Sequence, residues 1–266
     1  EPWVKVSCAP LGKYKSTHRY PSKGWEAYGT VYQDACAWME EGIMDVLFPM
    51  MYARGNNFYP FAIDWKERCA DKPVVPGLGI YCMLPKEGDW PAEEILRQIY
   101  FCRQLGLNGQ AYFRNEFLMN NTKGLFGEVR KSYYQHPALI PPLPGAPHPA
   151  PVSQGRYEET NMGEVNLEAN FVGIAASVTG DDVVFHVYGS SVYPVDTDDA
   201  QNLLFASLHA NSISFMPQGA ERYYAVTAAN RYGVESTPLS LNSPVDGDIP
   251  IVNDGNRLLI REGVIY

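Results

Sequence analysis

The stretch YQDACAWMEEGIMDVLFPMMY, residues 32–52, decides the fold of the first half of this chain. Its beginning, YQDACAWMEE, predicts a helix that ends at Gly42. Its end, DVLFPMMY at 45–52, is almost entirely apolar and predicts a buried strand. A helix that leads directly into a buried strand is typical of a parallel sheet with crossover helices.

The same kind of strand recurs in the first half of the chain. The other segments are WVKVSCAP (3–10), VVPGLGIY (74–81) and GQAYFR (109–114). A second helix is predicted over 92–105, which follows a proline and ends before Gly106. Ile95, Ile99 and Cys102 fall on one face of this helix, as expected for a helix that covers a sheet.

A closed barrel of eight strand and helix units needs about 250 residues. The four units found here end before a proline-rich break near residue 140. Four parallel strands alone would expose two edges and an apolar face, which isolated proteins avoid. We therefore expect an upstream segment, a second copy of the chain or a partner chain to complete the sheet.

The proline-rich stretch PALIPPLPGAPHPAP, residues 137–151, predicts a domain boundary, because proline resists both helix and sheet interiors. Short alternating segments follow it, at 165–172, 182–191 and 222–233. They predict an antiparallel β-sandwich. The expected fold is thus α/β plus all-β, with domains at 1–144 and 145–242. The tail at 243–266 predicts a hairpin or the start of a further module.

Composition excludes several classes of function. The formal net charge of -9 argues against a nucleic-acid partner, and no apolar run is long enough to predict a membrane span. The five histidines show no metal-ligand spacing, and no phosphate-binding glycine motif is present, so neither a metal nor a cofactor is expected. The five cysteines have apolar neighbours and no Cys-x-x-Cys spacing, which predicts free core thiols.

Two segments of the second half resemble a fibronectin type III domain. YYAVTAANRYGVESTPLSL (223–241) is similar to the last two strands of that fold, and VVFHVYGSS (183–191) is similar to the central strand before them. The resemblance implies a β-sandwich. It says little about function, because such sandwiches host many activities.

The first half, from Trp3 to about Pro144, resembles the C-terminal part of the glycosyl hydrolase-like 10 family of bacterial glycosidases. The matching segments are VSCAPLGKY (6–14), YGTVYQDACAWMEEGIMDVLFPMMY (28–52), VVPGLGIY (74–81) and GQAYFRNEFLMNNTKGLF (109–126). The second segment is the most specific, because a Tyr-x-Asp helix, a Trp, a Gly and a strand ending in Pro-x-x-Tyr recur at that spacing in the family.

This resemblance implies a (β/α)8 barrel in which the four segments are strands five to eight. Strands one to four would then lie upstream. It also implies an oligosaccharide or polysaccharide substrate and a secreted or periplasmic protein whose signal peptide has been removed. In the family the suspected catalytic acids follow the fourth barrel strand, in a segment that has no counterpart in this sequence. The chain could therefore lack its own catalytic acid.

Barrel active sites are built from the C-terminal ends of the strands and the loops after them. Glu116 follows the last predicted strand and is the candidate catalytic carboxylate, since glycoside hydrolysis uses paired carboxylates. The alternatives are a solvated glutamate at a helix start or an ion pair with Arg114. Arg114 itself is a candidate clamp for a sugar or carboxylate.

Further candidates offer hydroxyl, amide, guanidinium and aromatic groups at strand ends or in loops. The full set of candidate substrate-binding residues is Tyr52, Arg54, Asn56, Tyr81, Arg114, Trp25 and Trp90. For Tyr52 the alternative is a half-buried aromatic that closes the barrel layer.

Two hypotheses follow from the sequence. The chain is part of a glycoside hydrolase and carries one side of its cleft, or it is a noncatalytic carbohydrate-binding or scaffold protein with the same cleft. An enzyme needs paired carboxylates at the strand ends, whereas a binding protein does not.

Overall fold

The computed structural model describes residues 3–69, 72–139, 141–142, 145–170, 183–210 and 212–244, and the strands at 250–253, 256–261 and 264–265. The chain divides into two compact units, Glu1–Gln135 and His136–Tyr266. The division falls at the start of the proline-rich stretch. Among the described residues, no helix has both the length and the apolar character needed to cross a bilayer.

Four short strands run parallel to one another in the first unit. They are β1 (Ser7–Cys8), β2 (Val46–Leu47), β3 (Gly77–Leu78) and β4 (Ala111–Tyr112). β1 pairs with β2 and β3 pairs with β4, while parallel bridges from Leu47 to Val74 and from Met50 to Gly77 join the two pairs. The strands thus lie next to one another in chain order, each inside a segment for which the sequence predicts a strand.

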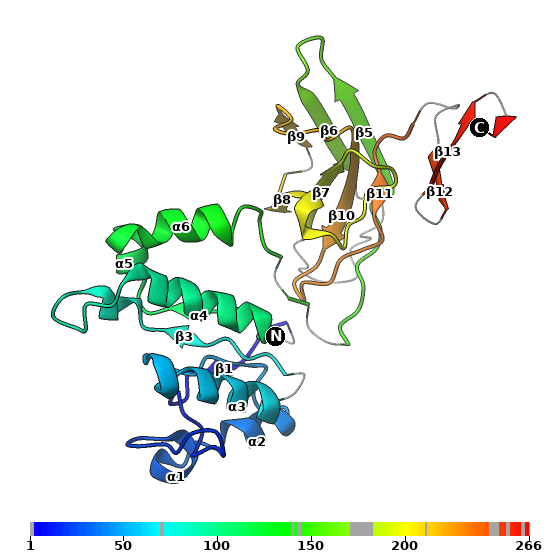
Figure 1. Ribbon diagram of the computed structural model, residues 1–266. Helices are drawn as coiled ribbons and strands as arrows, with labels where there is room; N and C mark the ends of the chain where they lie inside the picture. Colours follow the sequence, from blue (N-terminus) through cyan, green and yellow to red (C-terminus); the bar gives the residue numbers. More distant parts are fainter. Residues whose placement is uncertain are drawn as a thin grey trace. The chain divides into compact units, whose positions relative to one another are not determined.

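Helices follow each of these strands. They are α1 (Ala27–Val31), α2 (Ala35–Glu40), η1 (Gly55–Asn57), α3 (Tyr59–Cys69), η2 (Ile80–Met83), α4 (Ala92–Gln104), α5 (Asn115–Met119), η3 (Thr122–Gly124) and α6 (Leu125–Ser132). Figure 1 shows α3 and α4 lying alongside the strands. Trp65 of α3 and Ile95 of α4 are fully buried in one core with Leu47 and Leu78.

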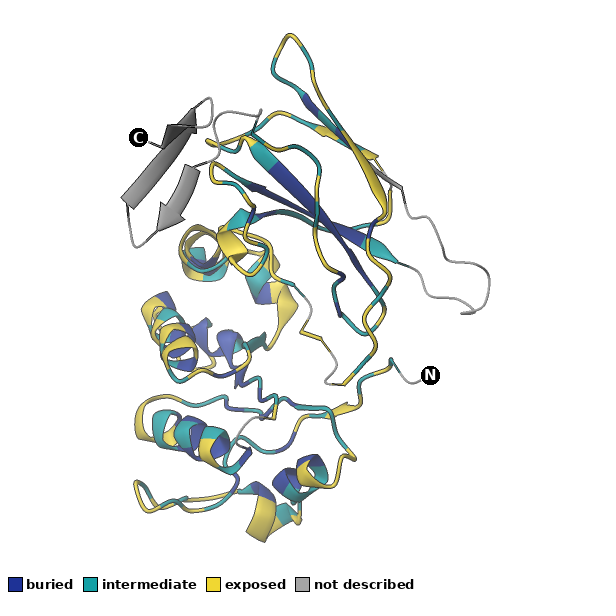
Figure 2. Ribbon diagram, turned by 90° about the vertical axis from the view of Figure 1, so that its right-hand side faces the viewer, coloured by how far each residue is buried: buried dark blue, intermediate teal, exposed yellow. Residues whose placement is uncertain are grey.

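The two faces of this small parallel sheet differ in burial. Leu47, Val74 and Leu78 are buried to 1% exposure or less. Val46 and Val75, which are next to Leu47 and Val74 in the sequence, remain partly exposed. Because neighbouring residues of a strand point to opposite faces, the helices cover one face and leave the other partly open. The buried residues in Figure 2 accordingly gather where the helices meet the strands.

Several helices differ from the sequence-based expectation. α2 begins at Ala35 rather than near Tyr32, because Tyr32 has a left-handed backbone with φ of 59° and ends α1. The Asp34 carboxylate then accepts the backbone N–H of Ala37 and caps α2. α1, α3 and α6 were not predicted from the sequence, although the buried residues Phe61 and Trp65 of α3 are spaced as on one helix face.

Among its described residues, the second unit contains three antiparallel sheets, one of which is formed by the tail. The four-stranded sheet has the order β11 (Leu239–Ser240), β10 (Tyr223–Ala229), β7 (Val184–Ser190) and β8 (Leu203–Leu208), and the three-stranded sheet has the order β5 (Gln154–Glu159), β6 (Val165–Asn170) and β9 (Ser212–Phe215). A 3-10 turn, η4 (Ala200–Asn202), precedes β8. Of the predicted strand at 165–172, the last two residues lie outside the described residues.

Side chains from both sheets form a common core. Val165 and Leu167 of β6 are buried with Val187 of β7 and Tyr224 of β10. The Tyr224 ring also stacks on Tyr157 of β5, with ring centroids 5.8 Å apart. The two sheets therefore pack face to face, as Figure 1 shows for β5 and β6 against β7 and β10.

The end of the proline-rich stretch is part of the second unit. The Pro147 carbonyl accepts a hydrogen bond of 2.8 Å from the Asn230 side chain. Val152, just after the stretch, is buried in the core of this unit. These residues belong to the β unit rather than to a free connection.

The tail forms further strands. β12 (Pro250–Asn253) pairs antiparallel with β13 (Asn256–Arg261), which pairs in turn with β14 (Val264–Ile265). Asn253 lies opposite Asn256, so β12 and β13 form a hairpin. Asp254 and Gly255, between these two strands, lie outside the described residues.

A buried polar cluster stabilises the four-stranded sheet. The Glu235 carboxylate accepts hydrogen bonds from the hydroxyls of Tyr188 and Thr227, and it lies 3.4 Å from Nδ1 of His186. Burial alone would raise the pKa of Glu235. The interactions with His186, Thr227 and Tyr188 outweigh it and hold the pKa below its usual value.

We expect acidification to lower the free energy of unfolding of the second unit more in the unmodified chain than in a Glu235→Gln variant. Because the folded-state pKa of Glu235 is lowered, its contribution is complete above the unfolded pKa of about 4.3 and disappears as the pH falls through the folded value. Scanning calorimetry of the intact chain from about pH 7 to pH 3 tests this. All five tryptophans lie in the first unit, so the transition of the second unit leaves tryptophan fluorescence unchanged.

Glu158→Gln is the matched control, because Glu158 is exposed and its ion pair with Arg156 lies at the surface. Its unfolding midpoint should follow that of the unmodified chain. Parallel pH dependences for the unmodified chain and the Glu235→Gln variant would contradict the role given to Glu235.

Candidate functional site

Three aromatic rings meet at the C-terminal ends of adjacent parallel strands. Tyr52 follows β2, Tyr81 lies in η2 directly after β3, and Phe113 follows β4. The ring of Tyr52 stacks on Phe113 at a centroid distance of 5.1 Å, and Tyr81 meets each of the other two edge-on at 5.8 Å. We call these three residues the aromatic cluster. Parallel pairing of the strands brings their ends to one edge of the sheet and so brings these rings together.

Two glycines make room for this cluster. A Cβ atom on Gly79 would lie 3.0 Å from Cβ of Tyr52 and 3.3 Å from the ring of Tyr81. A Cβ atom on Gly77 would lie 3.2 Å from the ring of Tyr52 and 3.1 Å from the Pro49 carbonyl oxygen. The segment GLG at 77–79 therefore has a packing role, because side chains there would collide with the cluster.

The cluster combines exposed ring surface with hydroxyl groups. Phe113 is 46% exposed, while Tyr52 and Tyr81 are partly buried. Burial raises the pKa of Tyr52, and it raises the pKa of Tyr81 to about 12. Both phenols are therefore protonated at neutral pH. The two hydroxyls can donate and accept hydrogen bonds beside an apolar ring surface, a combination that suits a sugar.

Arg114 and Glu116 follow the cluster in the chain. Nη2 of Arg114 lies 3.0 Å from Oε2 of Glu116, and both side chains are more than half exposed. The Arg114 guanidinium also lies over the ring of Phe117. The ion pair that the sequence analysis left as an alternative is therefore present, and Glu116 is presented to solvent together with a cation.

Trp90 lies in a loop, as predicted, but its ring is not available for stacking on a sugar. Its side chain is buried, with 7% exposure, and the Arg54 guanidinium lies over its ring at 5.7 Å. Lys123 donates to the Trp90 carbonyl and forms an ion pair with Asp89. Trp90 thus supports Arg54, and its ring is not presented for stacking.

The remaining candidates lie at the surface of the first unit. Trp25 is 72% exposed just before α1, and among the described residues it makes no ring contact with the aromatic cluster. Asn56 is exposed within η1. Its neighbour Asn57 accepts a hydrogen bond of 2.8 Å from Nζ of Lys13, which ties the loop after β1 to the loop after β2.

Sequence reasoning missed Phe113. It expected the segment 7–14 to line the cleft but did not single out Lys13 within it. Phe113 lies inside the predicted strand at 109–114. The alternation of apolar and polar residues in this segment is too short to show on which face of the sheet Phe113 lies. Lys13 lies in the predicted strand-end loop at 7–14, and only its contact with Asn57 distinguishes it from neighbouring lysines.

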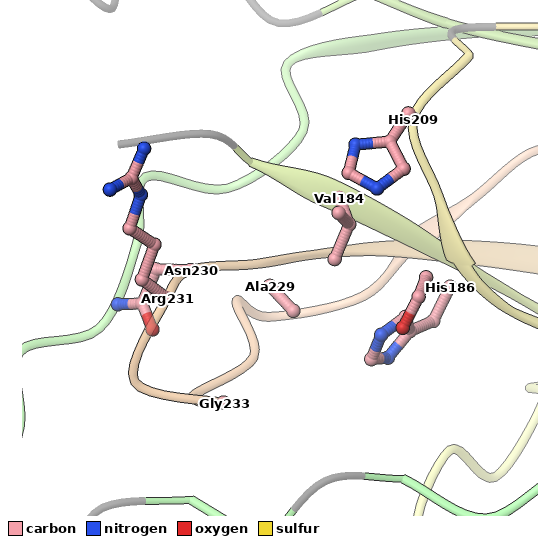
Figure 3. A pocket seen from close by; sticks show the side chains of 8 residues that line it. Val184, His186, His209, Ala229, Asn230, Arg231 and Gly233 are labelled. Atoms are coloured by element: carbon pink, nitrogen blue, oxygen red, sulfur yellow. The ribbon is translucent and has the colours of Figure 1, made fainter. Parts of the chain in front are cut away.

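In the described part of the chain, no three residues of the types His, Cys, Asp and Glu gather closely enough to hold a metal ion. The second unit has a shallow pocket of about 320 Å³, which the sequence did not predict. His186 and His209 lie at one side of it and Arg231 at the other (Figure 3). The Asn230 side chain at its rim is already bonded to Pro147.

Comparison with known proteins gives one clear similarity. No family model matches the chain. The chain is 28% identical over 165 residues to a protein named glycosyl hydrolase YngK from Bacillus subtilis (strain 168). The match covers 57% of this chain and 32% of that protein, so the chain spans about a third of its relative's length. The chain is therefore distantly similar to a protein named as a glycosyl hydrolase.

We expect Gly79→Ala to destabilise the first unit by about 1–3 kcal/mol, because the added methyl group must displace Tyr52 or Tyr81. Urea unfolding followed by tryptophan fluorescence measures this, since all the tryptophans belong to the first unit. Gly127→Ala is the control. Gly127 lies in α6, and its nearest heavy atom would be 4.0 Å from the new Cβ, so this change should stabilise by about 0.4–1 kcal/mol. Equal stabilities of the two variants would contradict the packing role of Gly79.

Proposed function

We propose that this chain is part of a glycoside hydrolase that acts on an oligosaccharide or polysaccharide, and that it carries one side of the cleft. The observation that carries the proposal is the aromatic cluster of Tyr52, Tyr81 and Phe113 at the ends of three adjacent parallel strands. Parallel α/β folds bind their ligands at this edge. The similarity to a protein named glycosyl hydrolase supports the same assignment.

The first unit is proposed to be the C-terminal half of a (β/α)8 barrel. Parallel strands in chain order, with helices on one face and a partly open second face, support this arrangement. Four strands do not close a barrel, so an upstream segment, a second copy or a partner chain would supply the other half. The relative is about three times longer than the matched region, which is compatible with an upstream half.

Each site residue receives a role in this proposal. The rings of the aromatic cluster would stack on a sugar, while Arg114, Arg54 and Asn56 would hydrogen-bond its hydroxyl or acid groups. Glu116 would act as one catalytic carboxylate and would face a second carboxylate from the missing half. Trp25 would extend the binding surface. Trp90 would act indirectly, because its buried ring positions Arg54.

The second unit is proposed to be a fibronectin type III-like module. Its three-stranded and four-stranded antiparallel sheets, packed face to face, support this assignment. Such a module often positions a neighbouring catalytic domain. We further propose that the protein is secreted or periplasmic, in agreement with a polysaccharide substrate outside the cytoplasm.

A noncatalytic carbohydrate-binding protein is the alternative. The ion pair of Arg114 with Glu116 favours this alternative, because the guanidinium already interacts with the carboxylate that catalysis would need. The aromatic cluster would serve a binding protein equally well.

We expect Phe113→Ala and Tyr52→Ala to weaken binding of a matching oligosaccharide by about tenfold or more, because each removes ring surface from the aromatic cluster. A glycan array identifies the ligand, and calorimetric titration of the intact chain then measures the dissociation constant. Tyr100→Ala is the control, because Tyr100 is 56% exposed on α4 away from the strand ends. If all three variants lost the same amount of affinity for the oligosaccharide, the aromatic cluster would not be its binding surface.

We expect Glu116→Gln to lower hydrolysis by the full-length gene product by about 100-fold or more while saccharide binding is retained. The full-length product is first sized by blotting extracts of the source cells with an antibody against this chain. Release of reducing ends measures hydrolysis, and Glu128→Gln, an exposed change in α6, is the control. A full-length protein that binds the glycan and releases no reducing ends would favour the noncatalytic alternative.

A further inference from the structure

Two of the five cysteines face each other inside the first unit. Sγ of Cys36 and Sγ of Cys69 lie 3.3 Å apart, and the two residues are 7% and 4% exposed. Cys36 lies in α2 and Cys69 is the last residue of α3. The residues are 33 positions apart in the chain, so their approach comes from the packing of two helices.

The two sulfur atoms lie close to the separation of a disulfide. A disulfide bond is about 2.05 Å long, so the two sulfur atoms need to approach by only about 1.3 Å. Rotation of the two cysteine side chains about χ1 moves the sulfur atoms by distances of this size. Both thiols are free in the structure, as are Cys8, Cys82 and Cys102.

The electrostatic environment distinguishes the two thiols. The hydrogen bond between them lowers the pKa of Cys69, while the Arg68 guanidinium acts to lower the pKa of both thiols. The same hydrogen bond, together with burial, raises the pKa of Cys36. Either sulfur can donate the hydrogen bond, and the lowered pKa of Cys69 favours this residue as the attacking thiolate.

We propose that Cys36 and Cys69 form an intramolecular disulfide bond when the chain meets an oxidant of the disulfide class. The bond joins the helix that follows β1 to the helix that follows β2. It is a covalent modification site in the scaffold of the candidate functional site, and it does not depend on the proposed function.

The reaction balances as thiol–disulfide exchange. The Cys69 thiolate attacks one sulfur of an external disulfide, forms a mixed disulfide and releases one thiolate, which takes up a proton. Cys36 then loses its proton and attacks Sγ of Cys69, which releases the second external thiol. The two cysteine sulfurs are oxidised, and the external disulfide is reduced to two thiols. Both thiols are buried, so the reaction requires local opening, and Cys69 lies at the end of α3, where a helix opens most easily.

The disulfide should stabilise the first unit, because it restricts the unfolded chain between residues 36 and 69. It crosses neither the aromatic cluster nor the ion pair of Arg114 with Glu116. Oxidation should therefore leave saccharide binding unchanged and raise the unfolding temperature of this unit alone.

The test uses the intact chain, incubated with oxidised glutathione and then denatured for thiol counting. We expect the number of titratable thiols to fall from five to three and the intact mass to fall by two hydrogen atoms. Peptide mapping should recover a cross-link between Cys36 and Cys69. The unfolding temperature reported by tryptophan fluorescence should rise by on the order of 10 °C.

Cys36→Ser and Cys69→Ser should abolish the cross-link and the temperature shift, whereas Cys8→Ser should keep both. If a serine variant fails to fold, the mass and the peptide map of the unmodified chain still decide the question. The proposal is overturned if five thiols remain after oxidation, if only mixed glutathione adducts form, or if the map shows a different pair.

Discussion

The parallel pairing of β2 with both of its neighbours is the constraint on which the first unit depends. Leu47 of β2 pairs with Cys8 of β1 and bridges to Val74 ahead of β3, and its side chain is fully buried under the helices. Because the strands are parallel and adjacent, their C-terminal ends lie at one edge. Residues from distant parts of the sequence, such as Tyr52 and Phe113, consequently come into contact.

The two units differ in how far the apolar faces of their sheets are buried. In the second unit, side chains on the facing sides of two sheets are buried against each other. In the first unit, helices cover only one face of the strands, and positions such as Val46 and Val75 stay partly exposed. A saccharide cleft built on this unit would need further chain to cover that face, which links the proposed function to the proposed barrel half.

Small residues and buried aromatics shape the surface around the aromatic cluster. Gly77 and Gly79 allow Tyr52 to lie directly on the neighbouring strand, where any larger residue would collide with it. Trp90 is buried beneath Arg54 and so holds a guanidinium near the strand ends rather than offering its own ring. The side chains exposed at the C-terminal ends of the strands therefore depend on buried residues that support them, as well as on the residues that could contact a ligand.

The sequence by itself determined the elements with strong local patterns. Apolar segments such as 45–52 predicted the strands, and the Gly42 and Gly106 stops predicted helix ends within one or two residues, because hydrophobic periodicity and chain-breaking residues act locally. Only the tertiary structure decided which side chains meet. In that structure Trp90 is buried, and Glu116 forms an ion pair with Arg114. Phe113 joins the aromatic cluster, and Cys36 lies next to Cys69. These contacts arise from strand register and helix packing between distant segments, and no local pattern encodes them.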